Sequence, residues 1–279
     1  MPRDLESEID TLDGMAPLTK EPDTGAPPIT GYNNLVQDKN TDPGDKLMRD
    51  MQQDDKRNEL HPFVQTLTLS NLDSCVQLEN ATFPPNEAAS KEKFIYRLTV
   101  CGELSLGLFT TTQTVENSNN ADLASVPTAS TAIPVDSNQP DRKELLLGHI
   151  VATKTDNTTI KDDDMTIPPD WPSNPSASPH LGHKEHGRTV ALHSLAVLPS
   201  YQRRGLGQIL LKAYVQRIET SGVADRVALL TYDRLIPFYE KLGFENRGRS
   251  AVTYGGGGWN DMVLEFKKPD GGNGTAKKD

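Results

Sequence analysis

The clearest pattern of apolar and polar positions in this chain lies between residues 192 and 221. It begins with apolar positions typical of a buried strand and continues, after a turn at Pro199-Ser200, into a repeat with helical spacing. The apolar positions are Leu211, Tyr214, Val215 and Ile218, and the polar ones are Gln208, Lys212, Gln216 and Glu219. Because the two sets fall on opposite faces, the repeat predicts an amphipathic helix that packs on a core and ends at Ser221-Gly222.

Weaker patterns on both sides of this segment predict further strands and helices. Strands are expected over 64–69, 104–111, 144–153, 188–198, 227–231, near 245–247 and over 261–266. Helices are expected over 70–78, 91–98 and 235–242. The alternation of the two types predicts an α/β domain.

Composition divides the chain into one domain and several polar segments. Residues 1–58 are rich in Asp, Glu, Pro, Gly and Asn and have few aromatic residues, so they predict a disordered leader. This leader is either a solvated segment or a regulatory tail. Residues 268–279 predict a disordered tail, which places the domain at 59–267. Within the domain, flexible insertions are expected near 112–141 and 162–187, where Thr, Ser, Asn, Asp and Pro predominate.

The charge and the few cysteines narrow the classes of function. The net charge is −10 and the isoelectric point about 5.1, which argues against nucleic acid as a partner and suits a cationic small molecule. No apolar run predicts a membrane span, and no secretory signal opens the chain, so we expect a cytoplasmic protein, with the nucleus as the alternative location. We also expect a monomer. Two cysteines cannot form a zinc site, and the spacing of His180, His183 and His186 in a loop predicts no metal.

The turn before the amphipathic helix is rich in glycine and arginine. Glycine lets the backbone approach a ligand closely, and the first N–H groups of a helix carry partial positive charge and lack internal partners. Such a turn can hold a diphosphate, although it can also be a plain connection. The spacing fits neither a Walker motif nor a dinucleotide fingerprint.

The turn and a second block resemble the GCN5-related N-acetyltransferases (GNAT). The pattern Gln/Arg-x-x-Gly-x-Gly follows a strand that ends in Leu-Ala-Val, and the block from Leu229 to Phe244 adds a strand, a short helix with a tyrosine, and Gly-Phe. The segments LHSLAV and ELSLGLF place the likeness nearest the arylalkylamine N-acetyltransferase branch, whose fungal members include polyamine acetyltransferases. The likeness covers roughly residues 60–266.

The resemblance implies a GNAT fold, with a mixed, mostly antiparallel sheet of about seven strands flanked by helices, and acetyl-CoA as cosubstrate. It also implies the residues that bind acetyl-CoA: Leu195, Ala196, Val197, Gln202, Arg203, Arg204, Gly205, Leu206, Gly207 and Gln208. Backbone N–H groups at Leu195 and Val197 would stabilise the negative charge that develops on the thioester oxygen. Phe83 and Pro84 would line the amine pocket, or they are packing residues at a helix break.

Acetyl transfer to an amine also requires a base and an acid. An alkyl ammonium has a pKa of about 10.4, so a base must remove its proton near neutral pH, and histidine suits this task. The vertebrate members carry His-x-His on this strand, whereas this chain has Ala191 and His193, which leaves His193 as the candidate base or as a buried structural histidine. Tyr239 lies where the family places the acid that protonates the thiolate; the alternative is a core tyrosine.

These observations predict an enzyme that transfers acetyl to a small primary amine, a polyamine or an arylalkylamine, directly in a ternary complex. Cys75 and Cys101 lie in no recognised nucleophile context, which argues against an acetyl-cysteine intermediate. The alternatives are a protein lysine or N-terminal acetyltransferase, and a module that binds acetyl-CoA without catalysis. The sequence does not decide among the amines.

Overall fold

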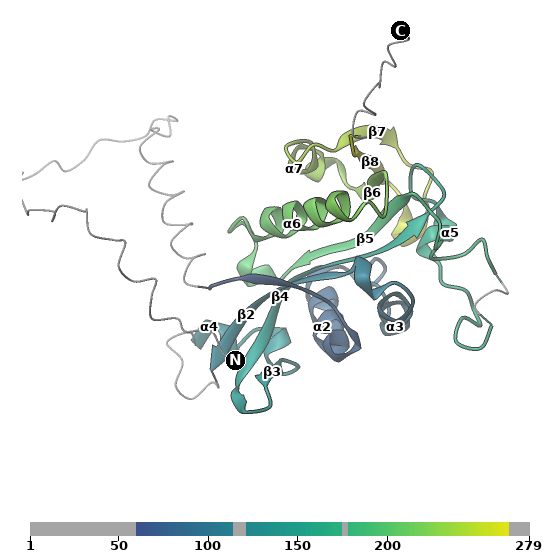
Figure 1. Cartoon of the computed structure of the whole chain (residues 1–279). Coiled ribbons are helices and arrows are strands. Elements are labelled where there is room, and N and C mark those ends of the chain that lie inside the picture. Colours follow the sequence, from purple (N-terminus) through teal and green to yellow (C-terminus); the bar gives the residue numbers. More distant parts are fainter. Residues whose placement is uncertain (1–59, 114–120, 175–177, 268–279) are drawn as a thin grey trace, which may run out of the picture. The chain divides into compact units, whose positions relative to one another are not determined.

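Eight strands form one sheet in the computed structural model of the chain (Figure 1). The structure describes residues 60–113, 121–174 and 178–267, all within the second of two units, residues 43–279. The predicted leader and tail lie outside the described residues. The strands are β1 (Phe63–Thr66), β2 (Leu106–Gln113), β3 (Ile133–Asp136), β4 (Gln139–Thr155), β5 (Thr189–Val197), β6 (Arg226–Thr231), β7 (Glu245–Arg249) and β8 (Asn260–Glu265).

The sheet has the order β1-β2-β4-β5-β6-β8-β7, and β3 pairs with β4 beside this path. Every pair is antiparallel except β5 and β6, which run parallel. A parallel pair needs a crossover connection, and α6 (Leu206–Ser221) provides it. The predicted mixed, mostly antiparallel sheet is therefore confirmed, with one strand more than expected.

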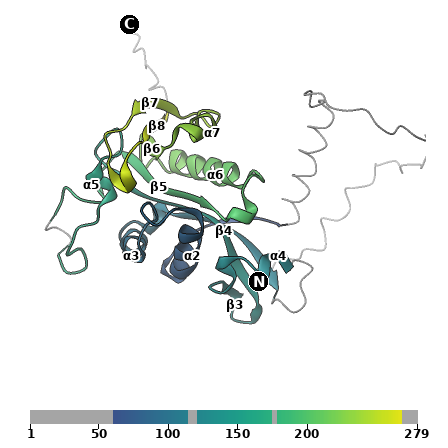
Figure 2. The same ribbon diagram turned by 180° about the vertical axis from the view of Figure 1, so that it is seen from behind.

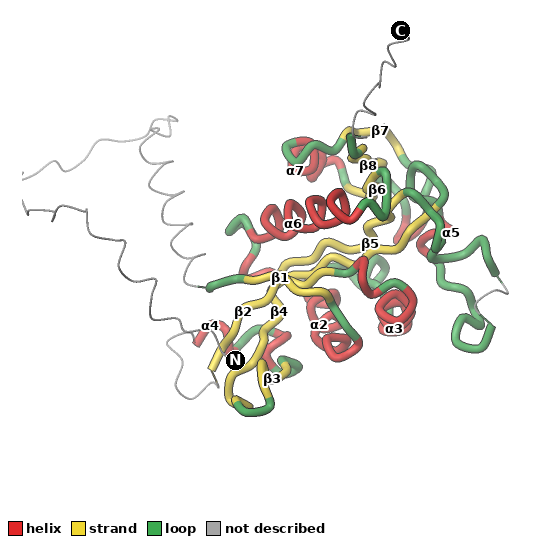
Figure 3. Tube along the Cα trace, in the orientation of Figure 1, coloured by secondary structure: helices red, strands yellow, loops and turns green. Residues whose placement is uncertain are grey.

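Helices cover both faces of the sheet. Figures 1 and 2 show α2 (Leu72–Thr82) and α3 (Lys91–Val100) on one face, and α6 on the other. The short helix α7 (Ile236–Glu240) lies on the same side as α6, beside the last strands (Figure 3). The strand β4 is consequently covered on both faces, and its residues from Leu145 to Ala152 are all buried.

The helix α6 forms where the apolar repeat predicted it. Gly205 precedes it with a φ of 79°, and Gly222 ends it with a φ of 63°, a left-handed conformation that glycine adopts without strain. The apolar face is buried against the sheet, and the Tyr214 hydroxyl donates to the backbone oxygen of Leu104 at 2.9 Å. The polar positions of the repeat, Gln208, Lys212, Gln216 and Glu219, are not among the buried residues of the helix.

Both predicted insertions contain short regular elements. The first holds α4 (Ala121–Ala124) and β3, which pairs with β4, and the second holds α5 (Asp162–Met165). The prediction missed β3 because its four residues carry almost no alternation and only Ile133 is partly buried. The described part of the second insertion also lies against the domain, since the His183 ring accepts the N–H of Lys154 at 3.1 Å. The flexibility of these segments stays a prediction.

Within the described ranges, the helices are too short or too polar to cross a bilayer. The same ranges contain no group of three or more His, Cys, Asp or Glu side chains that could hold a metal ion.

Candidate active site

The parallel strands β5 and β6 separate halfway along β5. Their register runs from Thr189↔Arg226 to Leu192↔Leu229 and stops there, while β5 continues to Val197 in pairing with β4. From His193 to Val197, β5 therefore has a strand on one edge alone among the described residues. An edge of this kind can form backbone hydrogen bonds with an extended ligand. Leu195, Ala196 and Val197, which were predicted to contact acetyl-CoA, all lie on this stretch.

The glycine-rich turn lies at the end of the same strand. A 3-10 turn over Pro199–Tyr201 leads into it, and the Gln202 amide donates to the backbone oxygen of Val197 at 3.0 Å. Arg203 adopts a φ of 61°, which is uncommon outside glycine, and Gly205 follows with a φ of 79°. These angles direct the chain into α6, so the first N–H groups of the helix, at Leu206, Gly207 and Gln208, lie next to the free edge of β5. The strand and turn residues predicted for acetyl-CoA thus lie along one continuous stretch of the fold, and their binding of acetyl-CoA stays a prediction.

His193 lies at an irregularity of the sheet. The register between β4 and β5 passes from Ala152↔Leu192 to Val151↔Ser194, so His193 is an extra residue on β5. Such a bulge breaks the alternation of side chains. Ser194 contacts Glu79 on α2, and His193 lies within electrostatic reach of Arg97 and Lys93 on α3. His193 Nε2 lies 2.8 Å from Thr153 Oγ1, and Nδ1 lies 3.2 Å from the sulfur of Met165.

The surroundings of His193 favour its neutral form. Burial, and then the positive charges of Arg97 and Lys93, hold the pKa of His193 well below its ordinary value of 6.5. The imidazole is therefore neutral near pH 7, and the lowered pKa makes it a weaker base than an ordinary histidine. Met165 lies beside Ala191: it belongs to the same buried cluster as Ala191 and contacts the His193 ring.

A buried polar group around Ser194 was not predicted from the sequence. The Glu79 carboxylate on α2 accepts the Ser194 hydroxyl at 2.7 Å and lies 3.0 Å from His149 Nε2, and its other oxygen accepts the Ala89 N–H at 2.9 Å. Burial raises the pKa of Glu79, but the hydrogen bonds and charge from His149, with those from Ala89 and Ser194, lower it overall, so the carboxylate stays ionised. In the sequence, Glu79, His149 and Ser194 are visible as polar residues within apolar stretches. Their contacts with one another depend on the fold and could not be predicted.

Tyr239 lies on α7, in an aromatic group with Phe238 and Phe244 at centroid distances of 5.0 and 5.7 Å. Burial raises the pKa of its phenol above the ordinary value of 10. The hydroxyl consequently keeps its proton near neutral pH, as a general acid requires. The buried position of Tyr239 also fits the alternative that it is a core tyrosine, so its catalytic role stays a prediction.

Phe83 and Pro84 follow the end of α2. Phe83 is partly buried against the main core, whereas Pro84 is exposed. The loop that they begin contacts the C-terminal part of the domain: Asn86 donates to the Gly255 oxygen at 2.6 Å, and Glu87 accepts the Tyr232 hydroxyl at 2.6 Å. This loop therefore lies across from the ends of β6 and β8, and the proposed contact of Phe83 and Pro84 with substrate stays a prediction.

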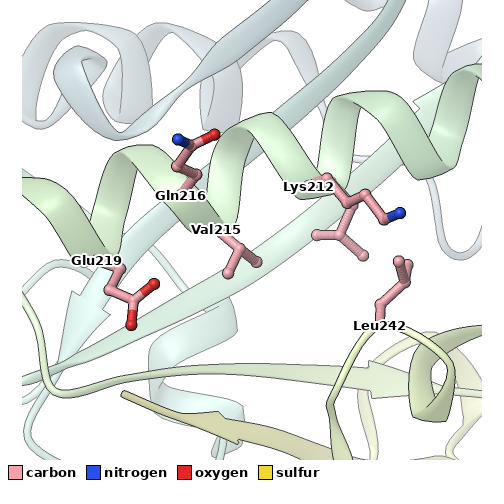
Figure 4. Close-up of a pocket in the computed structure, with 6 residues that line it drawn as sticks. Lys212, Val215, Gln216, Glu219 and Leu242 are labelled. Atoms are coloured by element: carbon pink, nitrogen blue, oxygen red, sulfur yellow. The ribbon is translucent and has the colours of Figure 1, made fainter. Parts of the chain in front are cut away.

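A small hollow lies elsewhere, along the middle of α6 (Figure 4). Its volume is about 140 Å³, and it is lined by Leu211, Lys212, Val215, Gln216, Glu219 and Leu242. None of these residues was predicted to bind acetyl-CoA, and none lies on the open stretch of β5.

Comparison with known proteins shows a family likeness for part of this domain. Residues 142–244, from β4 to the start of β7, match the model of the acetyltransferase (GNAT) family. This part of the chain is similar to the GNAT family, whose cosubstrate is acetyl-CoA.

Curated relatives match a part of the domain. Serotonin N-acetyltransferase of Mesocricetus auratus is 41% identical over 73 residues, which are 26% of this chain and 35% of that protein. The enzyme of Homo sapiens is 37% identical over the same length, and GCN5-related N-acetyltransferase 3, chloroplastic, of Arabidopsis thaliana is 31% identical over 71 residues, 25% of this chain and 30% of that protein. The chain thus spans about a third of the length of these relatives.

Solved structures align over more of the chain. The loading GNATL domain of CurA from Lyngbya majuscula covers 73% of this chain and 97% of its own, with a TM-score of 0.49 and 14% identity. The ribosomal-protein-S18-alanine N-acetyltransferase from Escherichia coli covers 76% and 97%, with a TM-score of 0.40 and 16% identity.

Proposed function

We propose that this domain transfers the acetyl group of acetyl-CoA to a small primary amine, directly and in a ternary complex. The observation that carries the proposal is the separation of β5 and β6 beside the glycine-rich turn. Arg203, Arg204 and the first amides of α6 would hold the diphosphate there, and the open edge of β5 would receive the pantetheine arm. Acetyl-CoA supplies a thioester carbonyl and a thiol leaving group.

The chain supplies the proton transfers and the charge stabilisation. His193, neutral near pH 7, would take a proton from the ammonium, whose nitrogen then attacks the carbonyl carbon. Backbone N–H groups at Leu195 and Val197 would stabilise the oxygen anion as it forms. When the carbon–sulfur bond breaks, the Tyr239 hydroxyl would protonate the thiolate. Direct transfer is favoured because burial raises the pKa of both thiols, that of Cys101 to about 12, and so suppresses the nucleophilic thiolate.

Among small amines, arylalkylamines are the favoured class because the curated relatives include serotonin N-acetyltransferases. Polyamines, which the acidic composition suits, are the second class. A lysine or N-terminal amine of a protein is the alternative acceptor. We expect the enzyme to act as a cytoplasmic monomer.

Thiol release decides between these functions. The full chain would be incubated with acetyl-CoA and, separately, with tryptamine, phenethylamine, spermidine, spermine and a basic peptide. Release with a small amine is expected. Release with the peptide alone would favour protein acetylation, whereas saturable binding of acetyl-CoA without release by any acceptor would indicate a non-catalytic module.

The variant Tyr239→Phe tests the general acid. Loss of a positioned acid lowers a rate by roughly 10²- to 10⁴-fold, so kcat should fall within this range while the Kd for acetyl-CoA changes little. Tyr214→Phe is the matched control, because it also removes a buried phenol hydroxyl, which donates to the backbone oxygen of Leu104. The control should lose about 1 kcal/mol of stability and keep its kcat. An unchanged kcat in Tyr239→Phe would remove the acid from the mechanism.

A further inference from the structure

Arg97 carries a buried charge that no described group contacts directly, although the Glu79 carboxylate attracts it at longer range. It lies on α3 with 2% of its surface exposed, and no hydrogen bond or ion pair joins its guanidinium to another residue in the ranges that the structure describes. A buried charge without a counter-ion is strongly unfavourable, because neither water nor a partner replaces its solvation. Such a charge is expected where a bound anion completes the pair.

The nearby carboxylates already have other partners. Both oxygens of Glu79 are engaged, one by the Ala89 N–H and the other by Ser194 and His149. Glu87 Oε1 accepts the Tyr232 hydroxyl, and Asp162 accepts the backbone N–H groups of Thr253 and Tyr254 at 3.0 to 3.1 Å. The protein thus offers Arg97 attraction at longer range but no direct carboxylate contact.

A second cation lies one helical turn earlier on α3. Positions i and i+4 of a helix share a face, so Lys93 and Arg97 lie on the same side. The Lys93 ammonium lies 4.2 Å from the centre of the Tyr254 ring. The charges of Arg97 and Lys93 both lower the pKa of His193, which indicates that the two cations lie within electrostatic reach of the proposed base. Burial and then Arg97 lower the pKa of Lys93 to about 8, so Lys93 is still mainly cationic at neutral pH.

We propose, resting on the acetyl transfer proposed above, that Arg97 and Lys93 bind a carboxylate of the acceptor, so that the preferred substrate is a primary amine that carries a carboxylate. The planar guanidinium suits a carboxylate because two parallel hydrogen bonds can form. The acceptor nitrogen would then lie toward His193. The same two charges repel a polycation and therefore disfavour a polyamine.

Matched pairs of acceptors test this specificity in the wild-type chain. Phenylalanine and phenethylamine differ by one carboxylate, and 4-aminobutyrate carries a carboxylate where butylamine carries a methyl group. A site built for a charged group rejects the analogue that lacks it, so kcat/KM should be at least about tenfold higher for the carboxylated member of each pair. An equal or lower value for the carboxylated members would overturn the inference.

Variants on α3 then assign the effect to its residues. Arg97→Gln should lower the ratio of kcat/KM for 4-aminobutyrate to that for butylamine by at least about tenfold. The ratio is the readout because the Arg97 charge also lowers the pKa of His193, so its loss alters the rate with both acceptors. Lys91→Gln is the matched control: it removes a cation from the same helix, but one that is exposed and paired with Asp73, so the preference should be kept. An equal loss with both acceptors would show that Arg97 does not recognise the carboxylate.

Two further results keep the test decisive. If Arg97→Gln does not fold, Lys93→Gln must lower the wild-type preference, and an unchanged preference would overturn the inference. Turnover of plain amines without any preference would reject the carboxylate site alone. Intact acetyl-CoA binding with no turnover of any amine would reject the proposed function itself.

Discussion

Replacing Gly205 by valine should remove saturable binding of acetyl-CoA. Gly205 has a φ of 79°, and it directs the chain from β5 into the N-terminus of α6. A β-branched side chain strongly disfavours this backbone conformation. The turn would then shift, and the amides proposed to hold the diphosphate would lose their alignment. We expect the Kd measured by calorimetry to rise at least about 100-fold, since several charge-assisted hydrogen bonds are lost together.

Gly222→Val is the matched control at the other end of the same helix. Gly222 has a φ of 63°, and an added Cβ would meet no atom within 4 Å, so the substitution introduces a comparable backbone strain without steric conflict. Both variants should lose stability, by roughly 1 to 3 kcal/mol, but the control should bind acetyl-CoA as the wild type does. Normal binding in Gly205→Val would contradict the proposed cosubstrate site.

The second large effect is expected at Glu79, where alanine should destabilise the domain by about 3 to 5 kcal/mol. The carboxylate is buried and accepts hydrogen bonds from α2–α3 loop backbone and from side chains of β4 and β5. Its removal leaves buried donors without an acceptor and creates a cavity between α2 and the sheet. Unfolding in denaturant measures the loss in free energy of unfolding. The dependence of this free energy on denaturant concentration is compared between the variants.

Asp73→Ala provides the control for Glu79. Asp73 is a carboxylate on the same helix, but it is 66% exposed and pairs with Lys91 at the surface. Exposed ion pairs contribute about 0 to 1 kcal/mol, so this variant should unfold close to the wild type. If Glu79→Ala lowers the free energy of unfolding by less than about 1 kcal/mol, the hydrogen bonds of the buried carboxylate contribute little to the stability of the domain.

The sequence by itself determined the elements that rely on local chemistry. The helix α6 follows from its apolar repeat, and its two ends follow from glycines that alone adopt left-handed angles without strain. The turn from Gln202 to Gly207 was recognisable for the same reason, since its glycines and arginines are consecutive in the chain. The strand β3 was missed because a short exposed strand has no alternation of buried and exposed positions.

Only the tertiary structure decided which polar side chains meet. Glu79, His149 and Ser194 are separated by up to 115 residues and come together where α2 crosses β4 and β5. The bulge at His193 could not be predicted, because regular alternation would place His193 and Ser194 on opposite faces. That no described carboxylate contacts Arg97 directly likewise depends on which carboxylates the fold has already engaged. Local periodicity determines helices and strands, whereas the partners of a buried charge depend on contacts between distant segments.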